Sequence, residues 1–259
     1  MSDGPVRLEQ DGALAVLTLA APPLNLFDRA MFDALDEATR TLAASPPRGL
    51  LVRAEGRAVS GGVDVHEFDG LSGEQGAALW ADLIRTVQRV EDLPCPTVFA
   101  AHALCLTAAF ELALGCDLLL AAESARFGLV EVVVGLTPSM GGTQRLVDRA
   151  GPARAKELVF TAELYGAATL ERWNVVNRVL PDEDFDAAAR AFALRLAEGP
   201  TVAHAATKRI VAAAVAGGSR EADGVVPEVS GPLFETEDLK GAVRSFLAEG
   251  PGKATYSGR

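Results

Sequence analysis

Apolar and polar positions alternate in short blocks at the start of the chain, and these blocks predict a hairpin followed by a helix. Two apolar-rich segments, 6–10 and 13–20, are separated by Asp11-Gly12, a dipeptide typical of two-residue hairpin turns. Between residues 31 and 42 the apolar positions recur at helical spacing, and Asp28 is placed to cap that helix.

A short strand and a second, longer helix are predicted next. The apolar run 49–53 indicates a buried strand. Ser72 and Gln75 have the spacing of a capping box, in which each side chain bonds the other residue's backbone amide at the start of a helix. The predicted apolar face of that helix consists of Trp80, Leu83, Ile84, Val87 and Val90.

The segment 97–122 is the most apolar part of the sequence, and it predicts a strand, a helix and another strand. We place these elements at 97–101, 108–114 and 117–121. The segment is long enough to suggest a membrane span, but Glu111 lies near its middle, and a charge at that depth is costly in a bilayer.

The second half of the chain is mostly helical by pattern. Proline suits the first turn of a helix, so we expect one helix over 138–149 and another beginning at Pro152. Asn174 is expected at a left-handed helix end, followed by a strand over 175–180 and by helices from residue 182 onward. Alternating strands and helices with a helical end predict an α/β fold.

The amino-acid composition limits which binding partners and which cellular compartment we expect for this protein. The 259 residues carry a net charge of −11, which argues against binding to nucleic acid or to an anionic membrane surface. Three cysteines, an odd number in apolar settings, do not make a disulfide framework. The first residues have no basic and apolar leader pattern, so we expect a soluble, cytoplasmic protein.

Two glutamates stand out because their neighbours are apolar. Glu111 lies inside the run 97–122, and Glu131 follows the mostly apolar segment 125–130 and precedes three valines at 132–134. If both are buried, loss of hydration raises their pKa values toward neutrality and equips them for acid and base chemistry. If each lies on a polar face instead, both are ordinary solvated glutamates, and the apolar pattern does not decide between the two interpretations.

Two further segments offer backbone amides to a ligand. Residues 57–65 contain the pair Gly61-Gly62, which permits close approach of a ligand to the chain, although an ordinary glycine turn is the more frequent meaning of such a pair. The second segment, 106–111, enters a helix directly after a strand. The Ala108 N–H is therefore a candidate hydrogen-bond donor, because the first amides of a helix lack internal partners.

The order of these segments resembles the crotonase superfamily, the enoyl-CoA hydratase/isomerase family. The resemblance extends over nearly the whole chain, and no single segment carries it alone. The segments in register are 21–26, 60–64, 96–117, 125–131, 138–145 and 234–238.

The resemblance implies a crotonase-like spiral of ββα turns over residues 1–198 and a helical oligomerisation section over 199–259. It further implies a homotrimer or a dimer of trimers. By position, Val63 and Ala108 would supply the oxyanion-hole amides, and Glu111 and Glu131 would hold the water of a hydratase. The substrate is then an acyl-CoA thioester, with no separate cofactor and no metal.

The same resemblance and the segments above give the candidate substrate and coenzyme A contacts. These are Leu26, Arg29, Ser60, Gly61, Gly62, Asp64, Val65, Leu106, Thr107, Phe110, Pro138, Gly141, Phe234 and Lys253. For the basic residues in this set, a solvated surface charge is the competing interpretation.

The segment 107–109, Phe110 and Val63 depart from the family pattern toward larger side chains. Hydratases of the family usually carry a run of glycines where this chain has Thr107-Ala108-Ala109, and Phe110 and Val63 are also larger than is common. We therefore expect a tighter or displaced carbonyl pocket. Hydration of a 2-enoyl-CoA is the leading hypothesis. The alternatives are isomerisation, thioester hydrolysis or a hydratase–lyase reaction, or acyl-CoA binding without turnover.

The last helices carry an apolar stripe at helical spacing. Leu239, Val243, Phe246 and Leu247 fall on one face. Such a face either packs on the chain's own core or, as the resemblance implies, lies between subunits.

Overall fold

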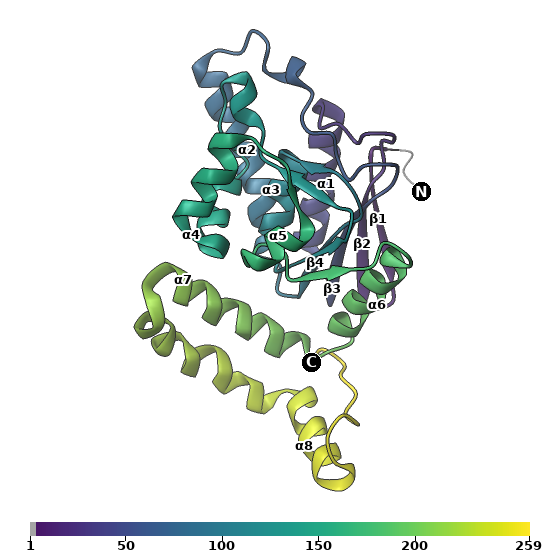
Figure 1. Ribbon diagram of the computed structural model, residues 1–259. Helices are drawn as coiled ribbons and strands as arrows, with labels where there is room; N and C mark the ends of the chain where they lie inside the picture. The colour runs from purple at the N-terminus through teal and green to yellow at the C-terminus, as the bar shows by residue number, and fades with distance from the viewer. Residues whose placement is uncertain (1–3) are drawn as a thin grey trace.

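A six-stranded sheet is the centre of the molecule. The computed structural model describes residues 4–259, and Figure 1 shows the sheet strands beside the helices that cover them. The strand order is β1 (Val6–Asp11), β2 (Leu14–Leu19), β3 (Gly49–Ala54), β4 (Thr97–Ala101), β6 (Leu118–Ala122) and β9 (Arg178–Leu180). Within this six-stranded sheet of the described residues, β1 and β2 pair in antiparallel fashion and all other neighbouring strands are parallel. Because β2, β3 and β4 are buried almost along their whole lengths, their sequences are almost continuously apolar.

A small second sheet lies beside the loop that follows β3. It joins β5 (Cys105–Leu106) to β7 (Arg126–Gly128) in parallel, and β7 to β8 (Tyr165–Gly166) in antiparallel fashion. A bridge between Ser60 and Cys105 connects it to the loop that follows β3. This arrangement brings the segment before Glu111 close to the glycine pair, although the two are far apart in the sequence.

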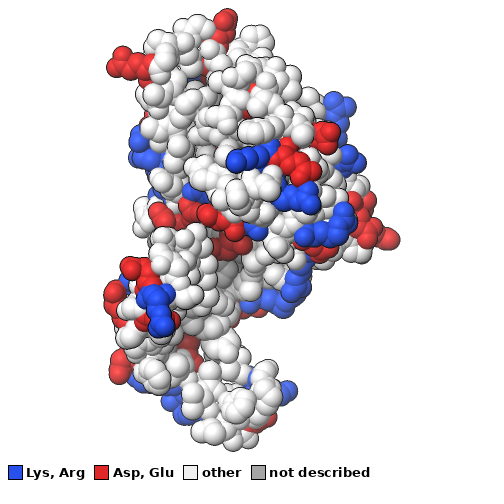
Figure 2. Space-filling view, turned by 60° about the vertical axis from the view of Figure 1, so that its left-hand side comes forward, with Lys and Arg blue, Asp and Glu red and all other residues white. Residues whose placement is uncertain are grey.

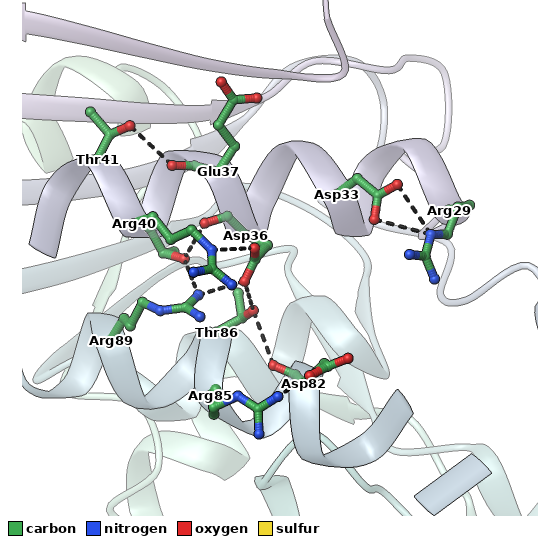
Figure 3. A network of polar contacts seen from close by, with 11 residues as sticks. Arg29, Asp33, Asp36, Glu37, Arg40, Thr41, Asp82, Arg85, Thr86 and Arg89 are labelled. Carbon is green, nitrogen blue, oxygen red and sulfur yellow. Dashed lines mark hydrogen bonds and ion pairs between the residues drawn. The ribbon is translucent and has the colours of Figure 1, made fainter. Parts of the chain in front are cut away.

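Helices surround the sheet. They are α1 (Arg29–Ala44), α2 (Gly73–Glu91), α3 (Ala108–Gly115), α4 (Gly142–Thr161), α5 (Ala167–Arg172) and α6 (Phe185–Ala197), with short 3₁₀ turns η1 (Val65–Phe68) and η2 (Glu131–Val134). Figure 3 shows how α1 and α2 are joined: Asp36 of α1 accepts from Arg40 on the same helix and from Arg89 of α2, each at 2.6 Å.

The C-terminal section extends away from the sheet. It consists of α7 (Thr201–Ser230), the 3₁₀ turn η3 (Gly231–Glu235) and α8 (Glu237–Glu249), drawn in green to yellow at the bottom of Figure 1. Lys208 of α7 forms an ion pair with Asp117 at 2.9 Å, which attaches this helix to the core. The division into units 1–198 and 199–259 stays a prediction.

Most local predictions are confirmed. The hairpin forms, although its two-residue turn is Gly12-Ala13 and not the predicted Asp11-Gly12, because Asp11 still pairs with Leu14. Asp28 caps α1 by accepting from the Met31 amide, and Ser72 and Gln75 form the capping box of α2. Asn174 has a left-handed backbone with φ 62°. The three cysteines are buried and free.

Two boundaries were predicted wrongly. Pro138 does not open a helix, because α4 begins at Gly142, where the amides of Met140 and Gly142 donate to the Glu111 carboxylate. The predicted helix break before Pro152 does occur, at Gly151. The strand expected over 175–180 is shorter, since the Asn177 side chain, rather than a ladder carbonyl, accepts the Leu119 amide.

Asn25 holds together the turn before α1 and the loop after β3. It is fully buried. Its side-chain amide donates to the carbonyls of Glu55, Ala58 and Val59 at 2.7, 3.0 and 3.2 Å, and its side-chain oxygen accepts the Ala21 N–H. Because residues 58–62 lead to Val63, Asn25 determines where that amide lies.

We predict that Asn25→Ala lowers the free energy of unfolding by roughly 3 kcal/mol, since it leaves buried carbonyls and an amide without partners. Urea denaturation measures the change. A loss under about 1 kcal/mol would show that water replaces the Asn25 side chain and that it is not a structural clamp.

Candidate active site

A cavity of about 240 Å³ lies between the loop after β3, the start of α3, the turn η2 and the helix α2. Its walls are largely apolar, which suits an acyl chain. The apolar residues that line it are Phe32, Val63, Val65, Phe68, Trp80, Leu83, Val130, Val133, Val134, Leu136 and Met140.

Two backbone amides on this cavity have no acceptor within residues 4–259. The Phe27 amide donates to the Gly62 carbonyl, and the Asp64 amide donates to the Phe27 carbonyl. The Val63 amide lies between these two hydrogen bonds and has no acceptor of its own. Ala108 is the first residue of α3 and has no intrahelical partner. Both residues line the cavity, as expected for donors to one ligand oxygen.

Glu111 is buried in α3, with 3% of its surface exposed. Its Oε2 accepts the Met140 amide at 2.9 Å and the Gly142 amide at 2.7 Å. A Cβ atom on Gly142 would lie 2.7 Å from the Glu111 Cγ, so only glycine lets this turn approach the carboxylate. Both bonds are on Oε2, which leaves Oε1 for a ligand.

Glu131 is the first residue of η2 and lines the same cavity. Both of its carboxylate oxygens are buried, and neither has a hydrogen-bond partner among the described residues. The alternative of two solvated glutamates is therefore wrong. A buried carboxyl without partners is costly, and it indicates a site that a ligand or a water completes.

Burial raises the pKa of both carboxyls. It raises the pKa of Glu111 to about 8, with the charge of Glu131 acting in the same direction and the two amides opposing it. It raises the pKa of Glu131 to about 7. Near neutral pH at least one of the two glutamates therefore holds a proton, as an acid–base pair requires.

An ion pair that sequence reasoning missed supports the Glu111 turn. Arg145 of α4 is 8% exposed; its Nη1 donates to the Gly141 carbonyl at 3.1 Å, and its guanidinium pairs with Glu91 at the end of α2. Gly141 has φ 109°, and a Cβ there would lie 2.1 Å from Arg145 Nη1. The only signal in the sequence was that Arg145 lies in the resembling segment 138–145.

The predicted site residues fall into three groups. Those that line the cavity are Gly61, Gly62, Val63, Val65, Thr107, Ala108, Glu111 and Glu131. Leu26, Ser60, Asp64, Leu106, Phe110, Pro138 and Gly141 lie in the segments that build it but are not part of its lining. Phe110, for example, is fully buried and packs on Phe127 with ring centroids 5.1 Å apart.

The third group lies away from this cavity. Arg29 forms an exposed ion pair with Asp33 on α1 (Figure 3). Phe234 is 68% exposed in η3, and Lys253 follows α8. Their contacts with coenzyme A stay predictions. The sequence analysis also missed Phe32, Phe68 and Leu136 as cavity residues, and it assigned Trp80 and Leu83 to an ordinary core face.

Two features are absent from residues 4–259. No cluster of His, Cys, Asp and Glu side chains of the size needed to hold a metal ion was found in that range. None of its helices combines the length and apolar character needed to cross a bilayer.

The raised pKa values predict how stability depends on pH. The folded chain binds more protons than the unfolded chain between pH 4.5, the ordinary glutamate value, and about pH 8, so stability falls as pH rises through this window. We expect the melting temperature to fall from pH 5 to pH 8, and Glu111→Gln to remove much of the fall.

The exposed Glu123 provides the matched control, because Glu123→Gln removes one carboxyl without touching the cavity. Thermal denaturation across the pH series measures all three proteins. If the melting temperature fell equally with pH in wild type and in Glu111→Gln, the raised pKa assigned to Glu111 would be contradicted.

Comparison with known proteins agrees with this geometry. A model of the enoyl-CoA hydratase/isomerase family matches residues 9–252. A probable enoyl-CoA hydratase of Rhizobium meliloti is 31% identical over 255 residues, which cover 96% of this chain and 97% of that protein.

Solved structures confirm the predicted crotonase-like α/β fold. An enoyl-CoA hydratase of Mycobacterium smegmatis superposes with a TM-score of 0.88 at 26% identity, covering 95% of this chain and 96% of its own. An enoyl-CoA hydratase of Bacillus anthracis, at 24% identity, shares the fold with a TM-score of 0.90 over 98% of this chain and all of its own. The chain belongs to the enoyl-CoA hydratase/isomerase family.

Proposed function

We propose that this protein is an enzyme that adds water syn across the double bond of a 2-enoyl-CoA, or catalyses the reverse elimination. The observation that carries the proposal is the pair of buried glutamates, Glu111 and Glu131, on one cavity with two backbone amides that lack partners. The names of the relatives, probable enoyl-CoA hydratase, support the same assignment.

The two amides polarise the substrate. The thioester carbonyl oxygen accepts hydrogen bonds from the Val63 and Ala108 N–H groups, which stabilise the negative charge that develops on it as water adds to C3. Ala108 also lies at the positive end of α3, which favours that charge further. Because both donors belong to the backbone, their direction is set by the fold and not by side-chain rotamers.

The two glutamates move the protons. One carboxylate takes a proton from the water as its oxygen bonds to C3, and the other carboxyl delivers a proton to C2. Each must be able to hold or release a proton near neutral pH, and the raised pKa values of about 8 and about 7 meet that need. The free Oε1 of Glu111 and the unpartnered oxygens of Glu131 are the atoms available to the water.

The apolar wall holds the acyl chain. Phe68 and Trp80 pack with ring centroids 5.4 Å apart, and Phe32 lines the same cavity. Coenzyme A is part of the substrate, so the proposal needs no separate cofactor. Arg29, Arg57 and Lys253 are the candidates to meet its phosphates, since the net charge of −11 makes a local positive group necessary.

Nucleic acid is not proposed as a partner. On the face shown in Figure 2, blue and red side chains are interspersed and separated by uncharged surface. Binding to a phosphate backbone needs a continuous basic surface, and together with the acidic balance of the chain this supports a small-molecule substrate.

Among the other reactions of the family, isomerisation fits less well. Isomerases of the family typically use the glutamate at the Glu131 position and lack the first. Here Glu111 is present, buried and held by two amides. A carboxylate that is costly to bury and carefully oriented supports a reaction that uses both glutamates.

We predict that Glu111→Gln and Glu131→Gln each reduce hydration of crotonyl-CoA by at least ~10²-fold, because general acid–base catalysis contributes typically 10²–10⁴-fold. Loss of the conjugated enoyl-thioester absorbance measures the rate, and calorimetry with a saturated acyl-CoA checks that binding persists. Glu123→Gln serves as the control with unchanged activity. Nearly full activity in either glutamine variant would refute the two-glutamate mechanism.

We also propose that the chain assembles as a homotrimer or a dimer of trimers. The C-terminal section exposes large apolar side chains, among them Phe246 at 59% and Leu247 at 80%. These two and Val243 line a groove of about 430 Å³ between α7, η3 and α8. Exposed apolar surface of this kind marks interaction sites.

We predict a solution mass of three or six times the 27.0 kDa chain mass by light scattering at micromolar concentration. Leu247→Asp introduces an unpaired charge into the groove and should shift the mass toward the monomer. Ala248→Asp adds the same charge to the same helix outside the groove lining and should leave the mass unchanged. A wild-type monomer would contradict the proposed assembly.

A further inference from the structure

Thr107 has a backbone conformation that suits glycine. It directly precedes α3 and has φ 47° and ψ −120°. Residues with a Cβ atom rarely adopt positive φ, and for a β-branched residue this is an outlier that costs free energy. The family usually has glycine at this position. The chain therefore keeps the glycine conformation while carrying a threonine side chain.

The Thr107 hydroxyl has no structural task. The residue is 6% exposed, and its Oγ1 has no hydrogen-bond partner among the described residues. A threonine before a helix ordinarily accepts from an amide of the first turn, but no such bond forms here. The backbone, in contrast, is fully used: its N–H donates to the Gly128 carbonyl and its carbonyl accepts the Glu111 amide.

The hydroxyl lies between the two candidate donor segments. A Cβ atom on Gly62 would be 3.1 Å from Thr107 Oγ1, so Gly62 leaves the space that this side chain occupies. Gly62 precedes Val63 in the chain, and Thr107 precedes Ala108. All four residues line the same cavity. A ligand oxygen that reaches both amides therefore comes close to the hydroxyl as well.

We propose that the Thr107 hydroxyl is a third hydrogen-bond donor to the carbonyl oxygen of the acyl thioester, beside the Val63 and Ala108 amides. The O–H donates without transferring its proton, and it adds to the stabilisation of the developing oxyanion. This inference rests on the acyl-thioester ligand of the proposed function, but not on hydration as the reaction. It explains why a strained threonine occupies a position that favours glycine.

Three variants separate the hydroxyl from the shape and the strain of Thr107. Thr107→Val keeps the shape and removes the O–H, Thr107→Ser keeps the O–H, and Thr107→Gly relieves the backbone strain. Thr143→Val is the control, because the Thr143 hydroxyl is also buried without a partner in the described chain but does not line the cavity.

Binding provides a test that does not depend on turnover. Affinity is measured for butyryl-CoA and for its thioether analogue S-butyl-CoA, which lacks the carbonyl oxygen. We expect Thr107→Val to weaken binding of the thioester about tenfold, the order of one hydrogen bond, and to leave the thioether unchanged. Thr107→Ser and Thr143→Val should keep the wild-type ratio of the two affinities.

A spectroscopic measurement reports the carbonyl directly. Binding of cinnamoyl-CoA should shift its absorbance to longer wavelength as the donors polarise the carbonyl. This shift should be smaller in Thr107→Val and in Thr107→Gly, while Thr107→Gly should have a higher melting temperature than wild type. The glycine variant keeps the experiment decisive if the valine variant does not fold.

Several results would overturn the inference. One is an unchanged ratio of thioester to thioether affinity together with a full absorbance shift in the variants without the hydroxyl. A second is loss of hydration with an unchanged ratio, which would place the hydroxyl on the water instead. If wild type binds acyl-CoA but does not hydrate enoyl-CoA, the proposed reaction fails while the affinity ratio still tests Thr107.

Discussion

Burial of the Glu111 carboxylate is the constraint on which the active-site geometry depends. A carboxylate in the interior must be compensated by hydrogen bonds, and here two backbone amides from the turn before α4 provide them. This explains why α4 begins at Gly142, why that residue has no side chain, and why Arg145 holds the adjacent Gly141 carbonyl. The Glu91 ion pair then ties the whole turn to α2, so the position of the Glu111 carboxylate depends on the three helices α2, α3 and α4.

Unusual backbone conformations occur where the fold presents its amides. Asn25, Gly62 and Thr107 all have positive φ. Asn25 tolerates this conformation and joins the two loops through its side chain, and Gly62 has no Cβ to clash. At Thr107 the strain has no such relief. The amides of Gly61, Gly62, Asp64 and Thr107 all donate within the protein, whereas those of Val63 and Ala108 are without an acceptor in residues 4–259.

Local signals in the sequence predicted much of the fold. Caps such as Asp28 and the Ser72–Gln75 pair depend on residues three apart, so the sequence alone could place the starts of α1 and α2. The two glutamates were recognisable because a charge in an apolar run is unusual. In the structure Glu111 is buried, and so are both carboxylate oxygens of the half-buried Glu131.

The features that could not be predicted from the sequence depend on contacts between distant segments. Periodicity identified Trp80 and Leu83 as one apolar face, but a residue facing a cavity and one facing the core have the same pattern. Arg145 and Glu91 are 54 positions apart, and nothing local indicates that they meet. Pro138 predicted a helix start. The prediction is wrong because hydrogen bonds from the Met140 and Gly142 amides to Glu111 fix the start of α4 four residues later.

Most of the buried side-chain polar atoms that lack a partner in residues 4–259 belong to residues of one cavity. Of the five buried side-chain atoms without a partner in residues 4–259, three belong to Thr107 and Glu131, and both residues line the cavity with the free amides of Val63 and Ala108. Folding ordinarily removes such orphans, because each costs about 1–3 kcal/mol. Their concentration beside an apolar pocket indicates that these polar groups bind a ligand. A ligand with an apolar chain and a carbonyl oxygen, bound together with a water molecule, would supply the missing hydrogen-bond partners.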